Sequence, residues 1–283
     1  MRIIEQYRSG FVISFEVFPP KTEAGVSKLM DELEILAVYK PGFISVTYGA
    51  GGSTRDRTLD LSLSVRERFN IEPLVHFTCV GADRDEISDY INIVKSYDLE
   101  NILALRGDPP EGEDRFAPPV NGFAHANELV EHISKIGSFC IAVAGYPECH
   151  VEAPDIDTDI DNLKRKVDSG ADYVITQLFF DNEDFYRFMD MARKKGISVP
   201  VVPGIMPVTN LAQLEKITDM FNPGIPEKLK SALHHAGSPE DMFSAGVEYS
   251  VEQCRELKKY GVPGFHFYPL NRAGAVSVII DSL

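Results

Sequence analysis

Eight short runs rich in β-branched and aromatic residues alternate with amphipathic segments along this chain of 283 residues. This alternation constrains the fold more than any other feature, because parallel strands joined by helices form either a closed barrel or an open doubly wound sheet. Eight strands favour a (β/α)₈ TIM barrel, which commonly uses about 250 residues as one domain. The open sheet is the alternative, although no first strand runs into a GxGxxG turn. We expect one catalytic domain over residues 1–283.

The element boundaries follow from the periodicity of the apolar residues. The expected strands are Val12–Phe18, Phe43–Tyr48, Leu74–Val80, Asn101–Arg106, Phe139–Gly145, Tyr173–Leu178, Val199–Pro203 and Gly264–Tyr268. The expected helices are Glu23–Tyr39, Thr54–Phe69, Arg84–Tyr97, Ala124–Ile136, Asp159–Ser169, Glu183–Lys195 and Leu211–Met220. The longer interval 222–262 is expected to hold two helices, and a final helix follows Asn271.

Charge and composition exclude several classes of function. The 28 basic and 43 acidic residues give a net charge of −15, which argues against nucleic acid and anionic membranes as partners. The apolar run 11–18 is short and interrupted by Glu16, so it does not resemble a signal peptide, and no stretch is long enough to span a bilayer. The four cysteines form no CxxC pair. We therefore expect a cytoplasmic protein with reduced thiols and without a metal site.

Polar residues recur on one face of the expected strands. That face carries Ser14, Glu16, Ser45, Thr47, His76, Thr78, Arg106, Gln177, His266 and Tyr268. The opposite face is apolar and carries Phe15, Val17, Ile44, Val46, Val75, Phe77, Leu103, Leu105, Phe265 and Phe267. Polar groups inside a barrel must be hydrogen-bonded or contact a ligand, and active sites of such barrels lie at the carboxyl ends of the strands. This pattern predicts an enzyme.

Two carboxyl groups are candidates for proton transfer. Glu16 lies among aromatic residues near the expected mouth, where burial would raise its pKa toward the range of a general acid. The alternative is a glutamate that faces solvent. Asp108 follows Arg106 and Gly107, and Gly107 permits a tight turn or a close approach of the backbone to a ligand. Asp108 is then either a positioned carboxylate or a turn cap.

Two segments are candidates for binding phosphate. Residues 48–54 (YGAGGST) join a strand to a helix, but their spacing matches neither a P-loop nor a dinucleotide fingerprint. Asp159, Asn162 and Lys166 share one helical face, with Arg165 beside them, in what we expect to be the first turns of a helix. Cations at a helix start suit a pyrophosphate. A surface lattice of ion pairs explains the same residues equally well.

A set of motifs running in order along nearly the whole chain resembles the FAD-dependent methylenetetrahydrofolate reductase family. No single motif is specific, but together they are. They are residues 14–20 (SFEVFPP), 45–50 (SVTYGA), 76–79 (HFTC), 104–108 (ALRGD), 146–148 (YPE), 162–168 (NLKRKVD), 176–181 (TQLFFD), 203–207 (PGIMP) and 265–272 (FHFYPLNR).

The resemblance implies a barrel with FAD at the carboxyl ends of the strands. NADH or NADPH would deliver hydride to the flavin and leave, and methylenetetrahydrofolate would then bind and be reduced to methyltetrahydrofolate. Glu16 would be the general acid that opens the folate ring, and Asp108 would tune pterin and flavin. Gln177, Tyr268 and Arg272 would bind the folate. The residues implied to contact FAD are Thr47, His76, Leu105, Arg106, Gly107, Asp108, Ala126, Tyr146, His150, Ala153, Asp159, Asn162, Arg165 and Lys166.

Two positions depart from the family pattern. His125 stands where the family often has a tyrosine beside the flavin, and Ile217 stands where a relative has a phenylalanine, so the resemblance assigns neither a role. It also leaves the electron donor open between NADH, NADPH and a redox partner subunit, and we expect a homo-oligomer. A folate-dependent methyltransferase on the same fold is the alternative function. A non-enzymatic acidic subunit is a second alternative, which does not explain the polar barrel interior.

Overall fold

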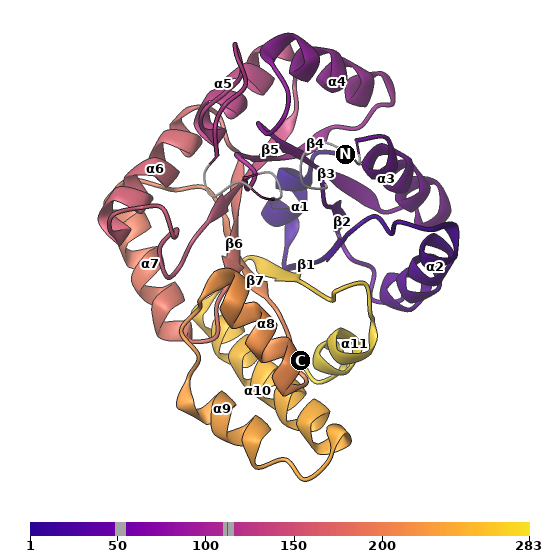
Figure 1. The fold of residues 1–283 in the computed structure, drawn as a ribbon, viewed down its shortest axis with the longest axis vertical. Helices are drawn as coiled ribbons and strands as arrows, with labels where there is room; N and C mark the ends of the chain where they lie inside the picture. The colour runs from indigo at the N-terminus through magenta and orange to yellow at the C-terminus, as the bar shows by residue number, and fades with distance from the viewer. Residues whose placement is uncertain (49–54, 110–111, 113–115) are drawn as a thin grey trace.

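The computed structural model describes residues 1–48, 55–109, 112 and 116–283. Eight parallel strands pair in sequence order, and β1 pairs with β8, so the sheet closes into a barrel (Figure 1). This confirms the (β/α)₈ prediction. The strands are β1 (Val12–Val17), β2 (Phe43–Val46), β3 (Glu72–Thr78), β4 (Asn101–Leu105), β5 (Cys140–Gly145), β6 (Tyr173–Leu178), β7 (Val201–Ile205) and β8 (Gly264–Phe267).

Helices surround the barrel, and each expected helix is present (Figure 1). The interval after residue 222 holds two helices, as predicted. The helices that follow the strands are α2 (Glu23–Ala37), α3 (Arg55–Phe69), α4 (Arg84–Ser96), α5 (Ala126–Ile136), α6 (Ile156–Asp168), α7 (Asn182–Lys194), α8 (Leu211–Phe221), α9 (Glu227–His234), α10 (Pro239–Tyr260) and α11 (Gly274–Asp281). None of the helices in the described part of the chain is long and apolar enough to cross a membrane.

One further helix, α1 (Ile3–Ser9), precedes β1 and was not predicted. It lies within the ring of strands in Figure 1. Its buried residues Ile3, Ile4 and Tyr7 pack with Phe43 and Tyr173 in the barrel interior. The buried face of this helix closes the amino-terminal end of the barrel and leaves the carboxyl end for a site.

Strand register determines which side chains point inward. Glu16 of β1 pairs with Ser45 of β2, and His76 of β3 pairs with Leu103 of β4. Paired residues of parallel strands point to the same face, so Leu103 lies inside. Leu103 and Leu105 pack with the interior cluster, and the prediction that they face outward was wrong. The expected polar interior is therefore confined to β1, β2, β3, β6 and β8.

Candidate active site

The carboxylate of Glu16 lies at the carboxyl end of β1, where three inward side chains of other strands surround it. Its Oε2 is 3.4 Å from His76 Nε2 and 3.7 Å from His266 Nε2. The hydroxyl of Ser45 donates to the same oxygen over 3.4 Å. Because 24% of the Glu16 side chain remains exposed, the group can reach a bound molecule at the barrel mouth. The prediction that Glu16 faces the barrel mouth is confirmed.

The direction of the Glu16 pKa shift differs from the prediction. Burial favours the neutral carboxyl group, as the sequence suggested. The hydrogen bond and charge of His266, together with His76 and Ser45, outweigh this effect and lower the pKa of Glu16 below its usual value. A sequence cannot reveal this, since His266 lies 250 positions away along the chain and only barrel closure brings it to Glu16.

His266 is fully buried and fixed on several sides. Its ring stacks on Phe43 at 5.7 Å and meets Tyr268 edge-on at 5.3 Å. Ser14 Oγ donates to the carbonyl of Phe265 over 3.2 Å, so its oxygen accepts from His266 Nδ1 at 2.8 Å. This contact fixes the ring so that Nε2 faces the Ser45 hydroxyl at 3.4 Å and the Glu16 carboxylate at 3.7 Å.

The residues predicted to bind substrate separate into two groups. Gln177 and Tyr268 are partly buried on β6 and just after β8, on the same rim as Glu16. Burial, followed by the charge of Glu16, raises the pKa of Tyr268 well above its usual value, so Tyr268 is a neutral phenol. Arg272 is exposed beyond β8. Ile217, which the sequence left unassigned, is buried on α8 in the cluster against which Tyr268 packs.

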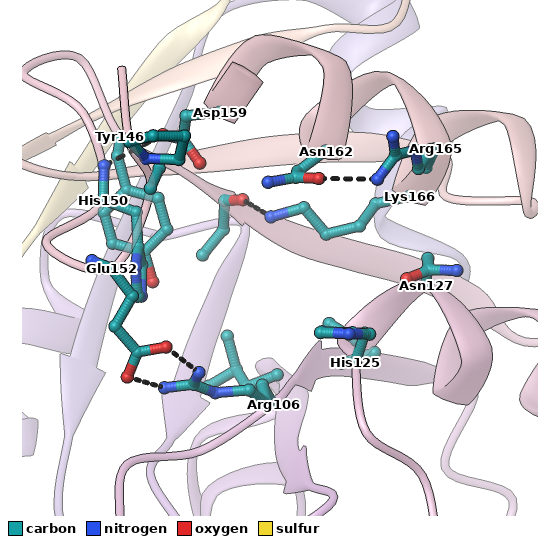
Figure 2. Close-up of a pocket in the computed structure, with 16 residues that line it drawn as sticks. Arg106, His125, Asn127, Tyr146, His150, Glu152, Asp159, Asn162, Arg165 and Lys166 are labelled. Atoms are coloured by element: carbon teal, nitrogen blue, oxygen red, sulfur yellow. Dashed lines mark hydrogen bonds and ion pairs between the residues drawn. The ribbon is translucent and has the colours of Figure 1, made fainter. Parts of the chain in front are cut away.

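A pocket lies between the carboxyl ends of β4 and β5 and the helices α5 and α6 (Figure 2). Its volume is about 250 Å³. The predicted cofactor residues in its wall are Leu105, Arg106, Ala126, Tyr146, His150, Ala153, Asp159, Asn162, Arg165 and Lys166. Thr47, His76, Gly107 and Asp108 are not among its lining residues. The structure thus gathers most of the predicted cofactor residues in one place.

The cationic wall of the pocket does not arise as expected. Helix α6 begins at Ile156, so Arg165 and Lys166 lie in its last turns and not in its first. Side chains of a helix lean toward its amino terminus, and Lys166 Nζ reaches back to donate to the carbonyl of Ala144 over 2.6 Å. Burial lowers the pKa of Lys166 to about 8, against the opposing charge of Asp159. The helix start in this wall is that of α5, at Ala126 and Asn127.

The sequence did not single out Glu152, which lines the pocket across from Lys166 (Figure 2). Both oxygens of its carboxylate accept from Arg106, Nη2 to Oε1 at 2.9 Å. The Arg106 guanidinium also lies 5.1 Å from the centre of the Phe116 ring. The sequence shows only that Glu152 follows His150 by two positions. That spacing does not indicate an ion pair with Arg106 at the end of β4. His125 also lines this wall.

The remaining candidates follow β4 and β2. Gly107 has φ +87°, and a Cβ there would lie 2.5 Å from Val80 Cγ2. The positive φ confirms that this position favours glycine, and the close approach is to residues at the end of β3. Asp108 is exposed, and its charge helps burial to raise the pKa of Tyr146. Thr47 is partly buried, and its carbonyl accepts from the Thr58 hydroxyl at 2.9 Å.

Two other sequence features contribute no residue to the site that the structure describes. The glycine-rich segment continues beyond Tyr48 outside the described residues, as does the end of the segment after Pro109. Within the described residues, no group of three or more histidine, cysteine, aspartate or glutamate side chains could hold a metal ion. The Cys149 thiol instead contacts the carbonyl of His150 at 3.5 Å.

Comparison with solved structures supports the fold. An uncharacterized protein from Clostridium thermocellum, which binds two copies of 5-methyl-5,6,7,8-tetrahydrofolic acid, matches with a TM-score of 0.63. The two chains are 15% identical, and the match covers 98% of this chain and 96% of that one. Oxaloacetate acetylhydrolase matches with a TM-score of 0.55 at 8% identity, over 99% of this chain and 82% of that one.

Comparison by sequence is more specific. The 5,10-methylenetetrahydrofolate reductase of Salmonella typhimurium is 40% identical over 274 residues, which cover 96% of this chain and 90% of that protein. Methylenetetrahydrofolate reductase (NADH) 1 of Arabidopsis thaliana is 39% identical over 281 residues, or 95% of this chain. The chain spans 47% of that plant protein, about half its length. The family model described as methylenetetrahydrofolate reductase matches residues 2–283. This chain belongs to the methylenetetrahydrofolate reductase family.

Proposed function

We propose that this protein reduces methylenetetrahydrofolate to methyltetrahydrofolate, with electrons that come from reduced nicotinamide and pass through FAD. The observation that carries the proposal is the position of Glu16, an ionisable carboxyl at the barrel mouth among two histidines and a serine. Family membership supports the same reaction. The plant relatives with NADH in their names favour NADH as the donor.

The pocket beside β4 and β5 suits FAD. Its wall offers Arg106, Arg165 and Lys166 in a chain with a net charge of −15, together with the start of α5. Cations and a helix start are the groups that stabilise a pyrophosphate. The ring of Tyr146 and that of His150 add an aromatic wall, with centroids 4.6 Å apart. Bound FAD would accept hydride from the nicotinamide and pass it to the folate.

Glu16 acts as the general acid in this proposal. An amine nitrogen of the folate leaves poorly unless it is protonated, and Glu16 supplies that proton at the mouth. Because its pKa is lowered, Glu16 must receive a proton before it can give one. The Glu16 side chain is itself 24% exposed at the mouth, so water can supply that proton directly. Gln177, Tyr268 and Arg272 hold the folate. Asp108 tunes the flavin and the pterin by its negative charge, which also acts on Tyr146 in the pocket wall.

The proposal is tested on the purified protein. It is expected to be yellow, to release FAD on denaturation, to be bleached by NADH or NADPH without oxygen, and to regain colour with methylenetetrahydrofolate. A colourless protein that cannot be reconstituted with FAD, and that transfers a methyl group from methyltetrahydrofolate, would establish the methyltransferase alternative instead. Size-exclusion chromatography with light scattering tests the expected homo-oligomer, and cell fractionation tests the expected cytoplasmic location.

A further inference from the structure

The ladder between β6 and β7 is irregular at the site. Val174 pairs with Val201 and Ile175 with Val202, but the next pair joins Leu178 to Gly204. Two residues of β6, Thr176 and Gln177, therefore stand opposite one residue of β7, as in a β-bulge. The N–H of Gly204 donates to Thr176 Oγ1 at 2.9 Å, so a side-chain hydroxyl takes the place of a backbone acceptor. Thr176 is 1% exposed.

The bulge leaves the Thr176 carbonyl for another partner. The Tyr268 hydroxyl donates to that carbonyl at 2.8 Å, while the Tyr268 N–H donates to the carbonyl of Ile205 at 2.9 Å. The phenol can cross β7 only because residue 204 is glycine. A Cβ there would lie 2.3 Å from the Thr176 oxygen and 2.7 Å from Tyr268 Cε2. Thr176, Gly204 and Tyr268 therefore form one buried unit that spans three strands.

The same unit determines what two predicted substrate residues can offer. Tyr268 has one hydroxyl hydrogen, and its bond to Thr176 uses it, so the phenol oxygen faces the site as an acceptor. Gln177 Oε1 accepts from the N–H of Leu178 at 2.9 Å. A backbone N–H can only donate, so the amide oxygen is held there and the NH₂ group remains as donor. The rim thus presents a donor at Gln177 and an acceptor at Tyr268.

We propose that Thr176 is a positioning residue that fixes this donor and acceptor pattern and so determines how the heterocycle of the substrate is recognised. The pattern fits a planar ring that carries a carbonyl acceptor and N–H donors, as a pterin does. The inference rests on the proposed function and adds to it a residue that does not itself touch the substrate.

Thr176→Val tests the inference, because valine keeps the shape of threonine and removes the hydroxyl. Gly204 N–H then loses its acceptor, and the Thr176 carbonyl beside residue 204 can compete with Tyr268 for a hydrogen bond. We expect KM for methylenetetrahydrofolate and Kd for methyltetrahydrofolate to rise about tenfold, the effect of one lost hydrogen bond. Flavin reduction by NADH should change less than twofold. Thr176→Ser keeps the hydroxyl and should restore both constants.

The controls separate positioning from general stability. Ser250→Ala removes a buried hydroxyl on α10, away from this unit, and should leave KM unchanged. If Thr176→Val does not fold, Thr176→Cys provides a weaker acceptor and should raise KM by a smaller factor. Unchanged KM and Kd in a folded Thr176→Val or Thr176→Cys enzyme, or equal slowing of both half-reactions, would overturn the inference. A wild-type protein without reductase activity would instead overturn the proposed function.

Discussion

Glu16 Oε2 and His76 Nε2 lie 3.4 Å apart, and at neutral pH they are an ionised carboxylate beside a neutral imidazole. Burial lowers the pKa of His76 to about 4, although the charge of Glu16 opposes this shift. The pKa of Glu16 is also lowered. The contact is therefore not an ion pair under physiological conditions. Its consequence appears when the pH falls.

Acid should destabilise the fold through His76. Between pH 4 and 6.5 the unfolded chain binds a proton at this histidine and the folded chain does not, so the free energy of unfolding falls as the pH falls. The depressed pKa of Glu16 acts with the same sign below its unfolded value. For His76 the loss is on the order of 3 kcal/mol over the whole window.

Urea unfolding of wild type and His76→Gln at several pH values measures this effect. The variant should lose stability less steeply, by up to about 1.4 kcal/mol per pH unit. His234→Asn, on the exposed side of α9, controls for the loss of a histidine. Parallel curves for wild type and His76→Gln would show that His76 takes up its proton in the folded state as well.

Glu16→Gln should separate the two halves of the reaction. Flavin reduction by NADH requires no proton on the folate and should change little. Reoxidation of the flavin by methylenetetrahydrofolate should slow by at least ~10²-fold, the lower end of general acid catalysis. Stopped-flow absorbance measures each half, with Glu67→Gln on the exposed face of α3 as control. If both halves slow equally, Glu16 positions groups and does not donate the proton.

Lys166→Met should weaken FAD binding without unfolding the barrel. A charge-assisted hydrogen bond contributes about 1.5–3 kcal/mol, so the affinity should fall roughly ten- to hundredfold. Fluorescence titration of the apoprotein measures it. Lys164→Met on the same helix is the matched control, because Lys164 pairs with Asp168 and does not line the pocket. Equal affinities in both variants would indicate that the cations of α6 form surface ion pairs and do not bind FAD.

Glu152→Gln should strengthen FAD binding. The carboxylate of Glu152 occupies the guanidinium of Arg106 and adds negative charge beside a pocket proposed to bind an anion. The pair is partly exposed, so the gain should be modest, about two- to fivefold, and smaller at high salt. Titration at two ionic strengths measures both. A weaker affinity would indicate that the ion pair holds Arg106 in its binding position.

Gly107→Ala should destabilise the protein more than Gly261→Ala. Both glycines have positive φ, +87° and +97°, which disfavours alanine by roughly 1–2 kcal/mol. A methyl group at 107 would also collide with Val80, whereas nothing lies within 4 Å of one at 261. Overpacking adds about 1–3 kcal/mol. Urea unfolding measures the free energy of unfolding of the two variants. Equal losses would mean that Val80 moves aside at little cost.

The barrel was predictable because its signal is local. Alternating runs such as residues 12–17 and 264–267 show strand periodicity in a few residues, and β1 and β8 appear where the pattern indicated. The start of α6 was missed because Asp155, the cap that accepts from Thr158 N–H, follows an irregular segment without a periodic signal. That error of three residues made Lys166 appear closer to the start of its helix than it is.

The sequence predicted which residues gather at the site, but it did not predict their pKa shifts or ion pairs. The motifs predicted that Tyr146 and Lys166 contact one ligand, and both side chains line one pocket. They also predicted Glu16 at the barrel mouth, where it lies beside His76 and His266. The sign of the Glu16 pKa shift and the Arg106–Glu152 pair depend on distances between strands far apart in sequence. The hydrogen bond from Tyr268 to the Thr176 carbonyl likewise requires a bulge that no local pattern reveals.

The position of α1 at the amino-terminal end of the barrel affects the order in which the chain folds. The Ile3 N–H donates to Asn101 Oδ1 at 2.8 Å, 98 positions further along the chain, and the Ile4 N–H to Cys140 Sγ, 136 positions further. A growing chain that has been translated only as far as β3 therefore lacks the strands to which the buried face of α1 binds. Contacts of such long sequence separation form slowly. Helix α1 is synthesised well before β4 and β5, so it reaches its native partners only after both strands have formed.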